Sequence, residues 1–223
     1  TMLTWTIAAA QYAPRKGDVA ENITHHLRFI DAAAEQACKV IIFPELSLTG
    51  PDDNQTLPAP PPDSELQPLS DAAQRYQMTI IAGLPVDKNG ARIKVIVIFN
   101  PDSGHPTKHQ QGHGTCLAPE SSQISVFELN NDGCELSSQA SLLATVSSMA
   151  EPQQQRTTDR LQRFAHKYAI AVLKSNYASG RFSGGSAMWD ENGQLIVRAD
   201  GGELLLTGRK SAQGWQGEII PLR

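Results

Sequence analysis

The chain has 223 residues, of which 40% are hydrophobic and 19% are charged, so it can form one globular domain, over residues 1–223, with a sizeable core. Its formal net charge is −4 and no basic block stands out, which argues against nucleic acid or an anionic membrane as a partner. No apolar stretch is long enough to cross a bilayer, and no basic leader precedes the apolar N-terminal residues, so we expect no membrane span and no secretory signal. The three cysteines are an odd, low number that does not suggest a disulfide framework and favours the reducing cytoplasm.

The first part of the chain follows a strand–helix–strand pattern. The apolar run at 5–12 ends shortly before Pro14, as a buried strand would. Asp18 can cap a helix that follows it, in which apolar residues recur at steps of three and four. The apolar run at 40–43 predicts the next strand. This order is typical of an α/β layer.

The rest of the chain is richer in strands than in helices. We expect a weak helix over 64–76, a second helix over 152–168, and no regular element over 105–123. The other expected strands cover residues 78–86, 92–100, 124–129, 141–148, 169–177, 203–208 and 217–222, with a β-hairpin over 184–200. Because the order at both ends is strand–helix–strand, the pattern favours a two-layer or sandwich-like α/β arrangement over a helical bundle.

A carboxylate stands at the end of the second strand. In KVIIFPELSLTG, residues 39–50, Glu45 follows the apolar run after a single proline. An ion rarely lies beside a buried strand without a partner or a task. Loops at the carboxyl ends of strands are also where sites collect in α/β sheets. Glu45 is therefore a candidate functional residue, with capping of the next turn as the alternative.

A polar segment, HPTKHQQGHG, holds Lys108 among three histidines, His105, His109 and His113. Taken alone, a lysine in a polar loop indicates only a solvated charge. The histidines are spaced four residues apart, but the segment lacks the usual ligand layout of a metal site, so we predict no metal.

The three cysteines differ in their prospects as nucleophiles. Cys38 lies on the apolar side of the expected helix end and is predicted to be an inert core residue. Cys134 follows a glycine turn in NNDGCELSS, and Cys116 lies in a glycine-containing loop. A cysteine is a useful nucleophile only as the thiolate, so either residue would need a nearby cation or base.

Taken together, these segments resemble the nitrilase superfamily of carbon–nitrogen hydrolases. The resemblance spans nearly the whole chain, in the family's order. It is carried by AAAQYAP (8–14), IIFPELSLTG (41–50), the NPDSG turn (100–104) leading to Lys108, VFEL (126–129), RLQRFAHKYAIAVLKSNYASG (160–180) and FSGGSAMWDENGQLI (182–196). The resemblance implies a four-layer αββα sandwich, a homodimer, no cofactor, and hydrolysis of a small-molecule amide.

The resemblance also implies a site made of a glutamate, a lysine and a cysteine. Glu45 matches the general base, Lys108 matches by position the lysine that holds the oxyanion, and Cys134 is the best candidate for the nucleophile. The backbone N–H of Glu135 would be the second donor to the oxyanion. Two residues at a strand end, Asn176 and Tyr177, are expected to line the substrate pocket, with simple packing at the strand end as the alternative.

The segment around Cys134 departs from the family pattern. Family members have a full apolar strand directly before the cysteine and a helix after it, whereas here NNDG precedes Cys134. Lys108 and Cys134 are 26 residues apart, which is shorter than is usual in the family. Three explanations stay open: residues are missing from the sequence at this point, the protein is a degenerate member that binds a small molecule or a protein without catalysis, or Cys134 sits differently and still works. Acyl transfer to an amine instead of water also stays open.

Overall fold

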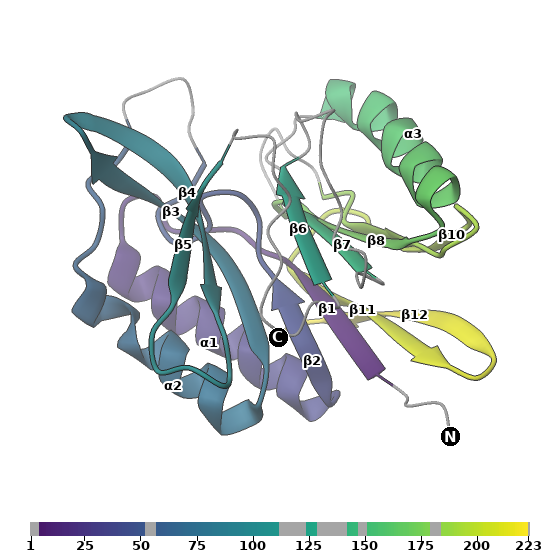
Figure 1. Ribbon diagram of the computed structural model, residues 1–223, viewed down its shortest axis with the longest axis horizontal. Helices are drawn as coiled ribbons and strands as arrows, with labels where there is room; N and C mark the ends of the chain where they lie inside the picture. The colour runs from purple at the N-terminus through teal and green to yellow at the C-terminus, as the bar shows by residue number, and fades with distance from the viewer. Residues whose placement is uncertain are drawn as a thin grey trace.

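The computed structural model describes residues 5–51, 57–111, 124–128, 142–146, 151–178 and 184–222. These residues form four layers, with helices on one side, two facing sheets in the middle and a helix on the other side (Figure 1). The predicted αββα sandwich is therefore confirmed. None of the helices in these ranges is both long and apolar enough to span a membrane.

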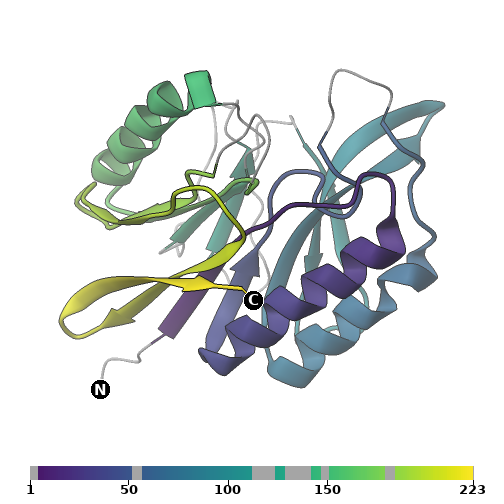
Figure 2. The same cartoon turned by 180° about the vertical axis from the view of Figure 1, so that it is seen from behind.

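The larger sheet has seven strands, most of them from the N-terminal half of the chain. Their order across the sheet is β12 (Gly214–Pro221), β11 (Leu204–Ser211), β1 (Trp5–Gln11), β2 (Cys38–Ile42), β3 (Thr79–Lys88), β4 (Ala91–Phe99) and β5 (Thr107–Gln110). The outer face of this sheet is covered by α1 (Val19–Glu35), the short 3₁₀ helix η1 (Asp63–Leu66) and α2 (Gln67–Tyr76) (Figure 2). Strands β1, β2 and β3 run parallel, whereas β3, β4 and β5 form an antiparallel meander.

The smaller sheet has five strands and comes from the C-terminal half. Their order is β10 (Leu195–Arg198), β9 (Ala187–Trp189), β8 (Ala171–Ser175), β7 (Leu142–Val146) and β6 (Ile124–Glu128). Strands β6, β7 and β8 are parallel, so their carboxyl ends share one edge of the sheet. Helix α3 (Glu151–Tyr168) covers the outer face of this sheet (Figure 1).

Side-chain alternation along the strands divides the apolar residues into two cores. On β4, Val97 and Phe99 pack with residues of α1 and α2, whereas Ile96 and Ile98 pack with residues of the smaller sheet. Successive side chains of a strand point to opposite faces, so each residue of β4 and of its neighbours can be assigned to the helix side or to the inter-sheet side. The same alternation determines which layer is faced by Lys94 on β4 and by Lys108 on β5.

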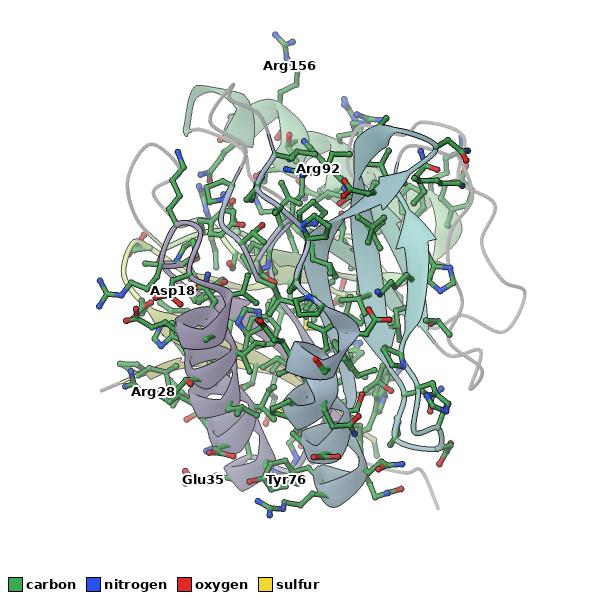
Figure 3. The ribbon with its side chains drawn as sticks, turned by 90° about the vertical axis from the view of Figure 1, so that its left-hand side faces the viewer. Asp18, Arg28, Glu35, Tyr76, Arg92 and Arg156 are labelled. Atoms are coloured by element: carbon green, nitrogen blue, oxygen red, sulfur yellow. The ribbon has the colours of Figure 1, made fainter. Side chains whose placement is uncertain are left out.

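Helices α1 and α2 lie side by side on the larger sheet (Figure 3). Asp18 caps α1, because its side chain accepts a hydrogen bond from the N–H of Glu21 at 3.0 Å. Near the other end of the pair, the Tyr76 hydroxyl of α2 donates to the Asp31 carboxylate at 2.6 Å.

Two local expectations are wrong. Residues 107–110 form the edge strand β5 instead of an irregular segment, because hydrogen bonding to β4 orders this polar stretch without a hydrophobic pattern of its own. Cys38 is the first residue of β2 and not part of a helix end, although it is buried as expected. Burial raises the pKa of its thiol to about 12.

Candidate active site

The carboxyl ends of several strands from both sheets meet at one edge of the sandwich. Strand β2 ends at Ile42 and leads to Glu45, and β8 ends at Ser175 and leads to Tyr177. The Tyr177 hydroxyl donates a hydrogen bond to the main-chain carbonyl of Glu45, so the ends of β2 and β8 are adjacent. This edge, with Glu45 at its centre, is the candidate active site.

The turn that carries Glu45 is tightly held by backbone contacts. The N–H of Gly50 donates to the carbonyl of Leu46 at 2.8 Å, and the N–H of Leu48 donates to the carbonyl of Gly83 on β3 at 2.9 Å. Leu46 has a φ of 55°, a left-handed conformation that is unusual for a leucine and that clusters at functional sites. A Cβ on Gly83 would lie 2.4 Å from the nitrogen of Leu46, so only glycine allows this close approach.

A buried histidine supports the same turn from α1. His26 is fully buried, and its ring stacks on Phe43 with centroids 4.0 Å apart. Nδ1 donates to the carbonyl of Asn22 at 2.7 Å, and Nε2 accepts from the hydroxyl of Ser47 at 2.9 Å. The Ser47 oxygen in turn accepts from the N–H of Gly83 at 3.2 Å. Burial lowers the pKa of His26 to about 3, so the neutral ring that this network requires is maintained at neutral pH.

The carboxylate of Glu45 has a lysine partner that the sequence analysis did not single out. Glu45 is only 8% exposed, and its Oε1 accepts from Nζ of Lys94 on β4 at 2.7 Å. Lys94 belongs to the same alternation as Ile96 and Ile98, so it lies on the inter-sheet side of the larger sheet. The alternation of side chains along RIKVIVIFN (92–100) could have shown which face of the strand carries Lys94, but not that Lys94 contacts Glu45.

The structure does not bring Lys108 to Glu45. Lys108 lies on β5 directly opposite Val97, a residue of the core on the helix side. Its Nζ donates to the carboxylate of Asp63, the first residue of η1, at 2.5 Å. Lys108 therefore points to the face of the sheet opposite to Lys94.

A second residue that sequence reasoning missed is Gln111. Its N–H donates to the carbonyl of Lys94 at 3.0 Å, which places it across the antiparallel ladder from that lysine and on the same face. Both polar atoms of its side chain are buried, and neither has a hydrogen-bond partner among the described residues. A buried amide without a partner is costly, so it marks a place where a ligand can bind.

The remaining predicted residues are only partly accounted for. Cys134 and Glu135 lie outside the described residues, as do Cys116 and His113. Tyr177 is buried and contacts the main chain of Glu45, as described above. Asn176 is fully buried, and its side-chain amide donates to the carbonyl of Gly184 at 2.9 Å. These contacts are those of residues that hold the strand end, and contact of either side chain with substrate stays a prediction.

The site offers acid–base chemistry from one carboxylate. In the described part of the chain, no three His, Cys, Asp or Glu side chains gather as they would around a metal ion. The arrangement instead provides a fixed, nearly buried carboxylate, an ammonium group in contact with it, and, directly after β5, the Gln111 amide, which has no hydrogen-bond partner among the described residues. Such a group can accept and return a proton beside a polar ligand.

Comparison with known proteins gives a family match over the first part of the chain. The carbon–nitrogen hydrolase family profile matches residues 6–128, which is more than half of the chain and includes Glu45 and Lys94. The match ends before Cys134.

Three solved proteins share the fold. The NitN amidase from Nesterenkonia sp. AN1 is 17% identical, with 91% of each chain covered and a TM-score of 0.73. A mutant of this amidase has been solved with butyramide. XC1258 from Xanthomonas campestris, a CN-hydrolase superfamily protein, is 17% identical over 95% of this chain and 92% of that one, with a TM-score of 0.76. The glutamine-dependent NAD⁺ synthetase from Acinetobacter baumannii is 15% identical over 99% of this chain but 49% of that one, with a TM-score of 0.72.

The sandwich, the pinned glutamate turn and the extent of the profile match lead to one conclusion: the chain belongs to the carbon–nitrogen hydrolase family, within the nitrilase superfamily.

Proposed function

We propose that the protein hydrolyses the carbon–nitrogen bond of a small amide through a cysteine thioester, with Glu45 as general base and Cys134 as nucleophile. The observation that carries the proposal is the Glu45 turn. Its carboxylate is nearly buried and ion-paired to Lys94, and its main chain is held by the Tyr177 hydroxyl and by the close approach of Gly83. A base positioned this firmly is suited to proton transfer.

The topology supports Cys134 as the nucleophile. Strand β6 is parallel to β8 and lies two strands away from it, a distance of about 10 Å, so it ends at the same edge as the Glu45 turn. The segment that carries Cys134 follows β6 and begins at Leu129. Cys134 is the sixth residue after Glu128, and this length of chain is enough to bring a thiol to Glu45.

The proposed reaction has two halves. The Cys134 thiol gives its proton to Glu45 as the sulfur attacks the amide carbonyl carbon, and the oxyanion that forms is held by a cation and by the N–H of Glu135. The carbon–nitrogen bond then breaks, and ammonia or an amine leaves with the proton from Glu45. In the second half, Glu45 takes a proton from water as the water oxygen attacks the thioester carbon. The carbon–sulfur bond then breaks, the carboxylic acid is released, and the proton on Glu45 passes to the sulfur and restores the thiol.

The side-chain amide of Gln111, which has no partner in the part of the chain that the structure describes, suggests how a small amide is recognised. A side-chain amide offers one acceptor and two donors, which complement the N–H and C=O groups of another amide. Small amides such as butyramide, which binds a mutant of the Nesterenkonia amidase, are therefore the first substrates to test. A homodimer in the cytoplasm, acting without a cofactor, is the expected setting.

The test is ammonia release from a panel of short aliphatic amides, with Cys134→Ala and Glu45→Gln as paired variants. We expect turnover by the wild type and loss of at least a hundredfold in each variant, because each removes a group that takes part in bond formation or proton transfer. Circular dichroism serves as the control for folding. An inactive wild type whose Cys134 reacts with iodoacetamide no faster than Cys116 would instead support the non-catalytic binding protein that the sequence left open.

A further inference from the structure

We infer that Lys94, and not Lys108, is the lysine that positions the Glu45 carboxylate. The inference rests on the proposed function, since it assigns a role within the same site. It concerns two lysines on adjacent strands of one meander, β4 and β5, whose side chains lie on opposite faces of the sheet.

Lys94 and Glu45 are in direct contact. Nζ of Lys94 lies 2.7 Å from Oε1 of Glu45, which is the length of a charge-assisted hydrogen bond. The side chain of Glu45 is 9% exposed and that of Lys94 is 35% exposed, so the pair is shielded on the carboxylate side and open on the ammonium side. Removing one partner of such a pair leaves a nearly buried carboxylate without its cation.

Strand alternation prevents Lys108 from taking the place of Lys94 beside Glu45. Lys94 shares its face with Ile96 and Ile98, whose partners lie in the smaller sheet. Lys108 is paired in register with Val97, which packs against the helices. Because residues directly opposite each other in an antiparallel ladder point to the same side, Lys108 could reach Glu45 only if β5 slipped by one residue.

Lys108 has an ion-pair partner of its own at the surface. Its ammonium contacts Asp63, whose side chain is 82% exposed, so this is a surface ion pair. Pairs of this kind contribute little or nothing to stability. The contact joins the edge strand β5 to η1, on the helix side of the sheet, where it has no access to Glu45.

The chemical role of Lys94 follows from its charge. Its ammonium group donates a charge-assisted hydrogen bond to the carboxylate that would accept the thiol proton. The hydrogen bond also fixes the direction in which Oε1 points. Lys94 is thus a positioning residue that acts through Glu45.

The experiment compares Lys94→Met and Lys108→Met in the full chain, with Lys94→Arg as the charge-conserving variant and Lys94→Gln as a second neutral one. The measurements are kcat and KM for ammonia release from butyramide between pH 5 and 9, and the rate of Cys134 alkylation by iodoacetamide over the same range. Loss of a cation at this distance is expected to lower kcat at least tenfold with a smaller effect on KM, and to slow Cys134 alkylation. Lys94→Arg should recover part of kcat, and Lys108→Met should stay within twofold of the wild type.

The outcomes separate the two proposals. If the wild type is active but Lys108→Met loses as much kcat as Lys94→Met, or Lys94→Met keeps the wild-type profile, the assignment of Lys94 is overturned and the hydrolase stands. If the wild type releases no ammonia from any amide, the hydrolase is overturned, and the alkylation profile then decides on Lys94 alone. A variant that does not fold by circular dichroism is replaced by Lys94→Gln, for which the same expectations hold.

Discussion

The buried histidine of α1 makes the stability of the protein sensitive to acid in a calculable way. Burial holds the pKa of His26 at about 3, against an ordinary value of 6.5 in the unfolded chain. Between these two values the unfolded chain binds a proton that the folded chain does not. The contribution of His26 is therefore fully present above pH 6.5 and is lost progressively as the pH falls towards 3.

The magnitude follows from the width of that window. Each pH unit below 6.5 lowers the free energy of unfolding by about 1.4 kcal/mol, so the loss at pH 4.5 is on the order of 3 kcal/mol. A loss of this size is a large fraction of the stability of an ordinary domain.

The assay is urea denaturation of the wild type and His26→Gln at pH 7.5, 5.5 and 4.5. The variant loses the Phe43 stack and is less stable at pH 7.5, but it lacks the titrating ring. The difference in unfolding free energy between the two proteins should therefore shrink by about 1.4 kcal/mol per pH unit below 6.5. His105→Gln, at an exposed position, is the matched control and should leave the pH dependence unchanged. A difference between wild type and His26→Gln that stays constant from pH 7.5 to 4.5 would refute the reasoning.

Three further predictions concern the site and its surroundings. Gly83→Ala should push the turn at Leu46 away, lowering stability by about 1–3 kcal/mol and activity with it. Gly104→Ala, at an exposed position where a Cβ would only make an ordinary contact with Gln74 at 3.9 Å, should change neither in urea denaturation and ammonia-release assays. Gln111→Leu should raise KM for a small amide about tenfold or more with less effect on kcat, and an unchanged KM would remove this residue from the pocket. The buried thiol of Cys38, with a pKa of about 12, should resist iodoacetamide at pH 7 in the folded protein and react in urea, as peptide mass mapping would show; rapid labelling in the native state would contradict its burial.

Much of the fold could be predicted because the strands have strong patterns of their own. The apolar runs at 40–43 and 78–86 and the periodic helix after Asp18 have the burial that their residues favour. Strand β5 could not be found in this way, since Thr107–Gln110 is a polar edge strand that is ordered by its neighbour. The placement of two sheets face to face came from the family resemblance, because pairing of distant strands leaves no local pattern.

The site was predictable in part for the same reason. Glu45 was recognised because a charge directly after a buried strand conflicts with its surroundings. The choice of lysine depends on strand register, and position in the chain favoured Lys108, whereas the alternation along β4 places Lys94 on the side of Glu45. Gln111 carries no signal at all in the sequence, because its interest comes from being buried without a partner in the described part of the chain.

The bond from the Tyr177 hydroxyl to the Glu45 carbonyl has a mechanical consequence. The turn with Glu45 follows a strand of the larger sheet, yet it is hydrogen-bonded to Tyr177, which follows a strand of the smaller sheet. If the two sheets slid past each other, the Glu45 carboxylate would move relative to its neighbours even if every residue around it were unchanged. Substitutions deep between the sheets, far from the carboxylate, can thus lower activity without lowering the stability of the fold.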